Sequence, residues 1–288
     1  MKRKLFFTFL VFGSVLTVRA QQLPARWDEL TASDWPKALA QSDSTCILPF
    51  GILEKHGPHV PIGSDLIQAH EWALRAVKQS YAVIFPDYLF GQINEAKHQP
   101  GAFALPERVT WDLLEATCDE IGRNGFKKIV IINGHGGNVA LINYFVQTRL
   151  SKRRKYAVYF FQPSQDSAYR KKFAALYHSE DQDDGHAGEM ETSVLLDMRP
   201  ELVEMSRAKD ESGKAQHRLP LPNLYTGIWW YADFPNHYAG DGSKATKALG
   251  RLMNAHYVGQ LVQALDLVKA DKETLKLQSE FFDRVLGQ

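Results

Sequence analysis

Short apolar runs alternate with amphipathic stretches along most of this chain. Four runs rich in β-branched and aromatic residues have the length of buried strands: Thr45–Phe50, Ala82–Phe85, Ile129–Ile132 and Ala157–Phe161. Between them, apolar positions recur at helical spacing over Leu66–Gln79, Thr110–Asn124 and Val139–Lys152. This alternation predicts a three-layer α/β/α fold, in which helices cover both faces of a mainly parallel central sheet.

The pattern loosens toward the C-terminus. Ala187–Asp197 has the character of a further helix, and Gly240–Lys244 introduces a long helix that runs to about Lys269. The sequence contains no internal repeat and no low-complexity linker. We therefore expect residues 21–288 to form a single domain.

The first 20 residues have the composition of a signal peptide. Three cationic residues, Lys2 to Lys4, precede an apolar stretch from Leu5 to Val18, and small residues stand at Val18 and Ala20. The stretch is shorter than the roughly 20 apolar residues of a membrane span. We expect cleavage near Ala20 and a periplasmic or secreted protein that is not inserted in a membrane. A short N-terminal anchor is the alternative.

Charge and cysteine content exclude several classes of protein. The formal net charge of +1 gives no basis for binding nucleic acid or an anionic surface. The two cysteines, Cys46 and Cys118, are too few for a disulfide scaffold. Each is expected to be a small buried hydrophobic residue, although an exported protein could also join them.

The segment that follows the first predicted strand carries several side chains of the kinds that bind metal ions. Glu54 and His56 are two residues apart, which places both on one side of an extended segment, and Asp65 follows after two prolines and two glycines. A carboxylate, an imidazole and a second carboxylate suit zinc, manganese or iron. His59 also lies in this segment, where we expect it to make a structural hydrogen bond. A polar loop without a metal is the alternative.

Two later segments carry the same chemistry. NGHGGN, from Asn133 to Asn138, follows the third predicted strand, so His135 should reach the same sheet edge as Glu54. HAGEMETS places His186 one helical turn before Glu189, so that both can face one cavity. Glu191 would point elsewhere unless the helix begins late. Acidic residues at a helix N-terminus also occur for dipole reasons alone.

Taken together, the three segments resemble the creatininase family of metal-dependent amidohydrolases. The resemblance covers most of the chain after residue 20 and extends to His98–Gly101, which is similar to the family's substrate loop. It implies two divalent cations per subunit, with Zn, Mn and Fe all chemically acceptable. It also implies a homo-oligomer, since the family often forms hexamers.

The resemblance also implies roles for individual residues. Glu54, Asp65 and His135 would hold one cation, and His56, Asp65 and a further carboxylate the other. Creatininase itself has that carboxylate at the position of Gly137, and here Glu189 is expected to replace it. His186 would transfer a proton and Glu191 would support it.

These inferences predict an exported metal-dependent hydrolase that cleaves an amide C–N bond, cyclic or in a small molecule. Two positions weaken the case for creatinine as the substrate: Gly137, where creatininase itself has an acidic residue, and Ala102, where the family usually has a threonine. A sugar lactam, an N-formyl group or a lactone-like ring would fit the same chemistry. Creatinine amidohydrolase proper and a non-catalytic periplasmic binding protein remain alternatives. The aromatic residues Trp229 to Tyr231 are expected in the core, with a pocket lining as the alternative.

Overall fold

A computed structural model describes residues 23–179 and 184–286. The predicted signal peptide, residues 1–20, lies outside this part of the chain. None of the helices within the described residues is long and apolar enough to cross a lipid bilayer.

One four-stranded sheet forms the centre of the fold. Its strands are β1 (Thr45–Phe50), β2 (Val83–Ile84), β3 (Lys128–Asn133) and β4 (Ala157–Phe160). They lie in the order β2-β1-β3-β4, and every neighbouring pair is parallel. The four predicted strands are thus confirmed, with β2 shorter than expected.

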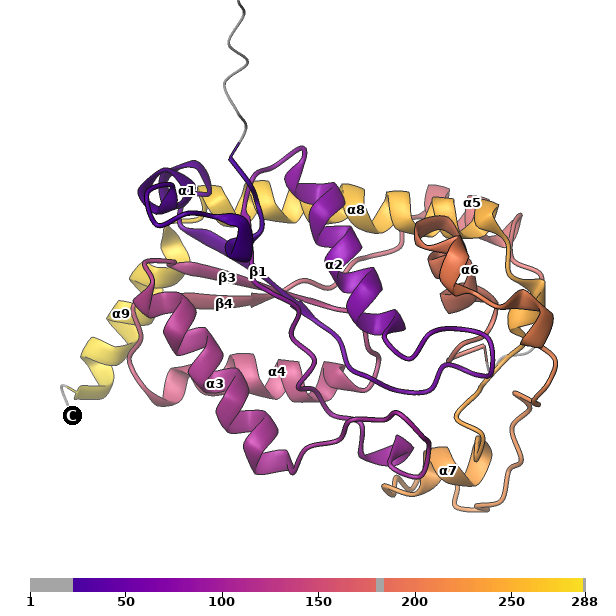
Figure 1. Cartoon of the computed structure of the whole chain (residues 1–288). Coiled ribbons are helices and arrows are strands. Elements are labelled where there is room, and N and C mark those ends of the chain that lie inside the picture. The colour runs from indigo at the N-terminus through magenta and orange to yellow at the C-terminus, as the bar shows by residue number, and fades with distance from the viewer. Residues whose placement is uncertain (1–22, 180–183, 287–288) are drawn as a thin grey trace, which may run out of the picture.

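Helices cover both faces of this sheet, and side chains alternate between two cores. Ile47 and Val130 face α2 (Ser64–Val77), α6 (Glu189–Met198) and α8 (Lys247–Ala270). Cys46 and Leu48 face α1 (Trp35–Gln41), α3 (Glu107–Arg123) and α4 (Asn138–Thr148). Figure 1 shows α8 on one side of the strands, with α3 and α4 on the other. The predicted three-layer α/β/α fold is confirmed.

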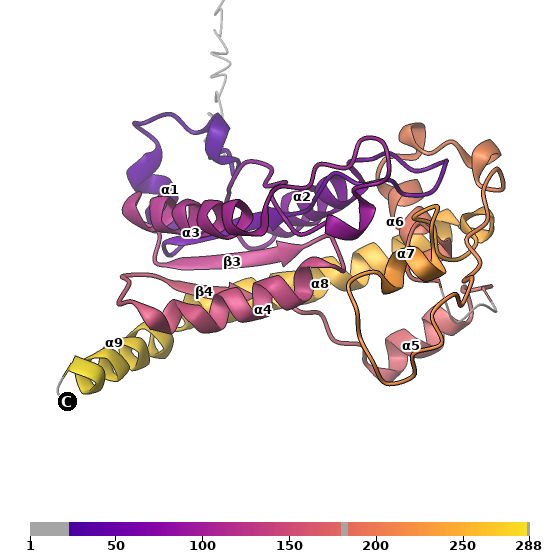
Figure 2. The same ribbon diagram turned by 90° about the horizontal axis from the view of Figure 1, so that it is seen from below.

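The remaining elements lie at the two ends of the sheet. Figures 1 and 2 both show the strands pointing toward α6 and α7, with α9 at the opposite end. Sequence periodicity alone did not identify four α-helices: α1, α5 (Ser167–Ala174), α7 (Trp229–Asp233) and α9 (Glu273–Leu286). Short 3₁₀ turns occur at Trp27–Glu29, Asn94–Ala96, Arg149–Ser151, Pro200–Leu202, Met205–Arg207 and Gly242–Lys244.

The two cysteines do not pair. Cys46 in β1 and Cys118 in α3 are both buried free thiols. Burial raises the pKa of Cys46 well above its ordinary value and that of Cys118 to about 12, so neither is a thiolate near neutral pH. The expectation of small buried hydrophobic residues is confirmed, and the disulfide alternative is not.

Two glycines of α8 provide a test of how closely α6 and α8 pack. A Cβ at Gly250 would lie 2.5 Å from the carbonyl carbon of Ser193 and closer still to its oxygen, whereas nothing lies within 4 Å of a Cβ at Gly259. We expect Gly250→Ala to lower the free energy of unfolding by about 1–3 kcal/mol through overpacking. Gly259→Ala should raise the free energy of unfolding by up to about 1 kcal/mol, because alanine favours the helix more than glycine does. Urea unfolding of both variants checks this, and equal effects would contradict the close packing.

Candidate metal centre

The candidate metal centre lies beyond the carboxyl ends of two adjacent strands. β1 and β3 pair in register up to Phe50 and Asn133, and the N–H of Gly134 then donates to the carbonyl oxygen of Phe50 (2.8 Å). Because the strands are parallel, the loops that follow them begin side by side. The segments that carry Glu54 and His135 therefore meet at this edge, as the sequence predicted.

Two glycines let the start of α2 approach this edge. A Cβ at Gly51 would lie 2.7 Å from the carbonyl carbon of Asp65, and a Cβ at Gly134 would lie 2.9 Å from the same atom. Any larger residue at either position would collide with backbone, which cannot move aside as a side chain can. The two glycines thereby place Asp65 between the β1 and β3 loops.

Glu54, Asp65 and His135 form the first group of candidate ligands. Nδ1 of His135 lies 2.8 Å from Oε1 of Glu54 and 3.3 Å from Oδ2 of Asp65. All three side chains are buried, and one atom from each lies within 4.8 Å of the others. This spacing would allow one ion to contact all three.

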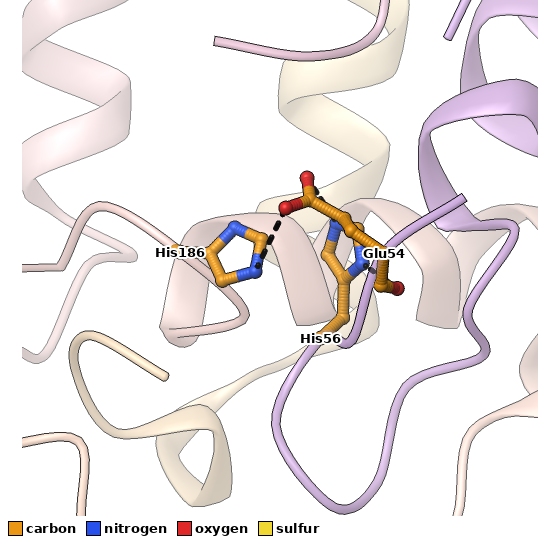
Figure 3. Close-up of side chains that lie close together, drawn as sticks. All are labelled: Glu54, His56 and His186. Atoms are coloured by element: carbon orange, nitrogen blue, oxygen red, sulfur yellow. Dashed lines mark hydrogen bonds and ion pairs between the residues drawn. The ribbon is translucent and has the colours of Figure 1, made fainter. Parts of the chain in front are cut away.

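A second group shares Glu54 and adds two histidines. Figure 3 shows the side chains of Glu54, His56 and His186 converging, and the three could likewise contact one ion. Nε2 of His56 lies 3.1 Å from Oδ1 of Asp65, and Nε2 of His186 lies 3.8 Å from Oε2 of Glu54. The two oxygens of Asp65 thus face different histidines, Oδ1 toward His56 and Oδ2 toward His135.

Backbone carbonyls determine which ring nitrogens carry protons. His56 Nδ1 lies 3.2 Å from the carbonyl oxygen of Glu54, and His186 Nε2 lies 2.8 Å from that of Lys55. A carbonyl oxygen can only accept, so each of these nitrogens is the N–H donor. Nε2 of His56 and Nδ1 of His186 are left as the nitrogens that can bind a metal ion or take up a proton.

The buried charges of this site perturb one another strongly. Burial acts to lower the pKa of His56, but Asp65 and Glu54 outweigh it and raise the pKa to about 10. Burial acts to raise the pKa of Glu54, yet His135 and His186 hold it well below its ordinary value. For His186, burial prevails and lowers the pKa, so this side chain is neutral near pH 7. Cation binding at neutral pH would therefore displace a proton from His56 but not from His186.

The donor set fits divalent cations. Oε1 of Glu54, Oδ2 of Asp65 and Nε2 of His135 are buried and have no hydrogen-bond partner among the described residues. Buried carboxylate oxygens are costly when they are ionised, and Oε1 of Glu54 and Oδ2 of Asp65 face only the His135 ring, which compensates them only while it is protonated. A cation contacted by the two carboxylate oxygens would offset that cost, and imidazole with carboxylate is the ligand chemistry of zinc, manganese and iron.

Glu189 does not join these groups, contrary to the sequence-based expectation. Its two carboxylate oxygens accept hydrogen bonds from the backbone N–H groups of His178 (2.9 Å) and Ser179 (2.6 Å). The expectation assumed that a helix already begins at Ala187. Instead α6 begins at Glu189, and Ala187 has a left-handed backbone with φ of 55°. The one-turn relation between His186 and Glu189 therefore does not exist.

Glu191 occupies the place expected for Glu189. Its Oε2 lies 3.8 Å from Nε2 of His56 and 3.6 Å from Nδ1 of His186, and it accepts a hydrogen bond from the N–H of Ala187 (2.7 Å). The late start of α6 is the condition under which Glu191 was expected to face this side. Glu191 is thus the carboxylate beside the second group.

His237 lies in this site although no sequence motif indicated it. It is 2% exposed, and its Nε2 contacts Oε2 of Glu54. It comes from the segment after α7, more than 180 positions along the chain, so only the tertiary fold reveals the contact. His59, in contrast, makes the structural hydrogen bond expected of it, to the hydroxyl of Thr192 (2.9 Å).

A cavity of about 690 Å³ lies between the Asn94–Ala96 turn, the start of α4 and the region of α7, and it is lined by Gly137, where a Cβ would contact the His135 ring. The residues that line it on these elements include Glu95, Gly137, Ile228 and Tyr231. His98 and Gln99 of the predicted substrate loop both donate to the carbonyl oxygen of Pro235 (2.8 Å each) and so connect that loop to the segment after α7.

The aromatic residues of α7 do not belong to the core, contrary to expectation. Trp229 and Tyr231 are each 38% exposed, and Tyr231 lines the 690 Å³ cavity. Trp230 packs edge-on against His186, with ring centroids 5.8 Å apart. Trp230 thus lies beside the candidate centre, whereas Tyr231 faces the cavity.

A second, smaller cavity of about 280 Å³ borders the site at Glu191. Gln68 and Glu191 line it, together with the stacked rings of Trp72 and Tyr257. Gln68 also donates to Oδ1 of Asp65 (3.4 Å). Gln68 and Glu191 thus connect this cavity to the candidate centre.

The family model of creatinine amidohydrolase matches residues 28–265. The chain belongs to the creatininase family of amidohydrolases. Creatinine amidohydrolase of Pseudomonas putida is 26% identical over 194 residues, which cover 63% of this chain and 75% of that protein. Mycofactocin precursor peptide peptidase of Mycobacterium ulcerans is 26% identical over 267 residues, 88% of this chain and 91% of that protein.

Solved structures of this family share the fold. A crystal structure of creatinine amidohydrolase superposes with a TM-score of 0.72 at 21% identity and covers 86% of this chain and 99% of its own. A creatinine amidohydrolase homologue from Bacteroides fragilis gives a TM-score of 0.67 at 21% identity. The match covers 80% of this chain and 91% of that protein. Solved creatininases include a manganese form and a Zn–Zn form of a variant.

Gly137 has a steric reason to be glycine in this member of the family. A Cβ there would lie 3.1 Å from Cε1 of His135, closer still to its Nε2, and 3.1 Å from Oε1 of Glu95. The neighbouring Gly136 has no atom within 4 Å of such a Cβ. The acidic side chain that creatininase has at the position of Gly137 does not fit here unless His135 moves.

We expect Gly137→Ala to weaken the binding of Zn²⁺ by about 10-fold or more, because the methyl group displaces a candidate ligand, His135. Gly136→Ala is the matched control and should bind Zn²⁺ like the wild type. Competition with a chromophoric chelator measures both affinities. Unchanged binding by Gly137→Ala would show that His135 does not need its present position.

Proposed function

We propose that this protein is an exported hydrolase that uses two divalent cations to cleave an amide C–N bond. The observation that carries the proposal is the buried convergence of carboxylate and imidazole groups from three distant segments on Asp65. Glu54, Asp65 and His135 would hold one cation, and His56, Asp65 and Glu191 the other. Asp65 would bridge them, since its two oxygens face the two histidines separately.

Bound at these residues, two cations would supply a water molecule of lowered pKa and polarise the scissile carbonyl. The chain's own contribution is proton transfer by His186. Its Nδ1 is free of a proton, because Nε2 donates to the carbonyl of Lys55, and it lies 3.6 Å from Oε2 of Glu191. As the water oxygen bonds to the carbonyl carbon, His186 would accept the water proton and pass it to the leaving nitrogen when the C–N bond breaks.

Two classes of substrate fit this chemistry. A cyclic or small-molecule amide is the class that the sequence predicts. A peptide is the second candidate, because Glu191 lines a cavity of about 280 Å³ and Gly137, whose Cβ would contact His135, lines another of about 690 Å³, which is more room than a single small ring needs. The similarity to the M. ulcerans peptide peptidase over 88% of this chain agrees with that candidate.

Removal of metal and a panel of substrates test the proposed reaction. Products from creatinine, other cyclic amides, N-formyl compounds and linear peptides are measured by mass spectrometry. We expect turnover to be lost after chelation and restored by Zn²⁺ or Mn²⁺. His56→Ala should be inactive while its far-UV circular dichroism spectrum shows that the chain is still folded.

His70→Ala serves as the control, since His70 pairs with Asp87 outside the centre and its variant should retain activity. Full turnover by a metal-free preparation would refute the metal-dependent mechanism. A metal-loaded protein that binds members of the panel but releases no product would instead favour the non-catalytic binding protein.

Export is part of the proposal and rests on the cationic start, the apolar stretch and the small residues before Gln21. We expect the protein recovered from the periplasm or the medium of its host to begin near Gln21. N-terminal sequencing of fractionated cells measures this. Full-length protein confined to the cytoplasm would refute export.

A further inference from the structure

His237 connects the candidate centre to α7. Nε1 of Trp230 donates a hydrogen bond to Nδ1 of His237 (2.7 Å), and Nε2 of His237 contacts Oε2 of Glu54. His237 is 2% exposed, and its ring also packs against that of His186, with centroids 4.4 Å apart. The three residues Trp230, His237 and Glu54 form a continuous chain of hydrogen bonds.

The indole of Trp230 determines which groups donate and which accept in these hydrogen bonds. An indole N–H can only donate, so Nδ1 of His237 must be the accepting nitrogen. The ring proton is therefore on Nε2, where it points at a carboxylate oxygen. His237 thus donates to Glu54 as a neutral imidazole and leaves the negative charge of Glu54 available for a cation.

We propose that His237 and Trp230 are positioning residues that orient the carboxylate of Glu54 for metal binding. The inference rests on the proposed function in taking Glu54 as a metal ligand. By holding Oε2, His237 directs Oε1 toward Nδ1 of His135 at 2.8 Å. Oε1 has no hydrogen-bond partner among the described residues, as expected of an atom kept for an ion.

The backbone around His237 is built to maintain this contact. His237 has φ of 53°, a left-handed conformation that residues other than glycine seldom adopt. Its N–H donates to the carbonyl of Phe234 (2.9 Å), and two residues later Ala239 exchanges two backbone hydrogen bonds with His186 (2.9 and 3.1 Å). An unfavourable conformation retained by its surroundings is characteristic of functional positions.

The same hydrogen bonds connect Glu54 to the wall of the larger cavity. Trp230 lies on α7 between Trp229 and Tyr231, and Tyr231 lines that cavity. The side chain that supports the metal ligand and a side chain that lines the cavity are thus neighbours on one short helix. A shift of α7 would disturb both.

Two substitutions of His237 separate its two hydrogen bonds. Asn places its side-chain oxygen near the position of Nδ1, where it can accept from Trp230, but it is too short to reach Glu54. Gln extends far enough to place an amide N–H near Nε2 and can restore the donor to Glu54. Asn tolerates the left-handed conformation better than most residues, so His237→Asn should fold.

We expect His237→Asn to bind Zn²⁺ about 10- to 100-fold more weakly than the wild type, the usual effect of losing a hydrogen bond to a metal ligand. His237→Gln should recover most of the affinity, and Trp230→Phe should lose less than His237→Asn. Chelator competition gives these values without any substrate. Wild-type affinity in His237→Asn, or equal losses in the Asn and Gln variants, would overturn the proposal.

The tautomer of His237 provides a readout that needs no metal. Long-range ¹H–¹⁵N NMR spectra of the metal-free protein should show His237 protonated at Nε2, with its signals identified by their absence in His237→Asn. Trp230→Phe should weaken that preference. A proton on Nδ1 in the wild type would overturn the proposal. If the wild type binds no divalent cation, the proposed function fails, whereas the tautomer still decides whether His237 donates to Glu54.

Discussion

The burial of the Glu54 carboxylate is the constraint around which this end of the molecule is arranged. An ionised carboxylate removed from water is stable only if donors or cations surround it. Here His135 faces Oε1, while His237 and His186 lie on the side of Oε2. These histidines come from three different segments, so the fold must bring all three together to accommodate one charge. Such an arrangement suits a site that binds cations better than it suits a site built for stability alone.

The sheet and two close backbone contacts make that convergence possible. Parallel pairing of β1 and β3 starts the Glu54 and His135 segments side by side. Gly51 and Gly134 then let the backbone at Asp65 approach both strand ends. Neither contact contributes a ligand, yet each sets the distance at which Asp65 faces His56 and His135. The precision of the candidate centre therefore depends on backbone packing as much as on the ligand side chains.

The further carboxylate beside His56 comes from α6 and not from the loop that follows β3. An acidic residue at position 137 would collide with His135 and Glu95. Glu191, on α6, stands beside His56 and His186 instead. Gly137 also lines the 690 Å³ cavity. A side chain at position 137 would therefore affect both the space around His135 and the shape of that cavity.

The sequence by itself determined the architecture and most of the candidate ligands. Apolar runs and helical spacing are local signals, so the strands and the order of layers followed from them, as did the meeting of Glu54, His56 and Asp65 with His135 at one sheet edge. Only the tertiary structure showed that Glu191, and not Glu189, lies beside His56 and His186. Which of the two faces the site depends on where α6 begins after a left-handed Ala187. The tertiary structure also decided the contact between His237 and Glu54, which are separated by more than 180 positions. Local periodicity carries no information about such contacts, since they arise only when distant segments pack against one another.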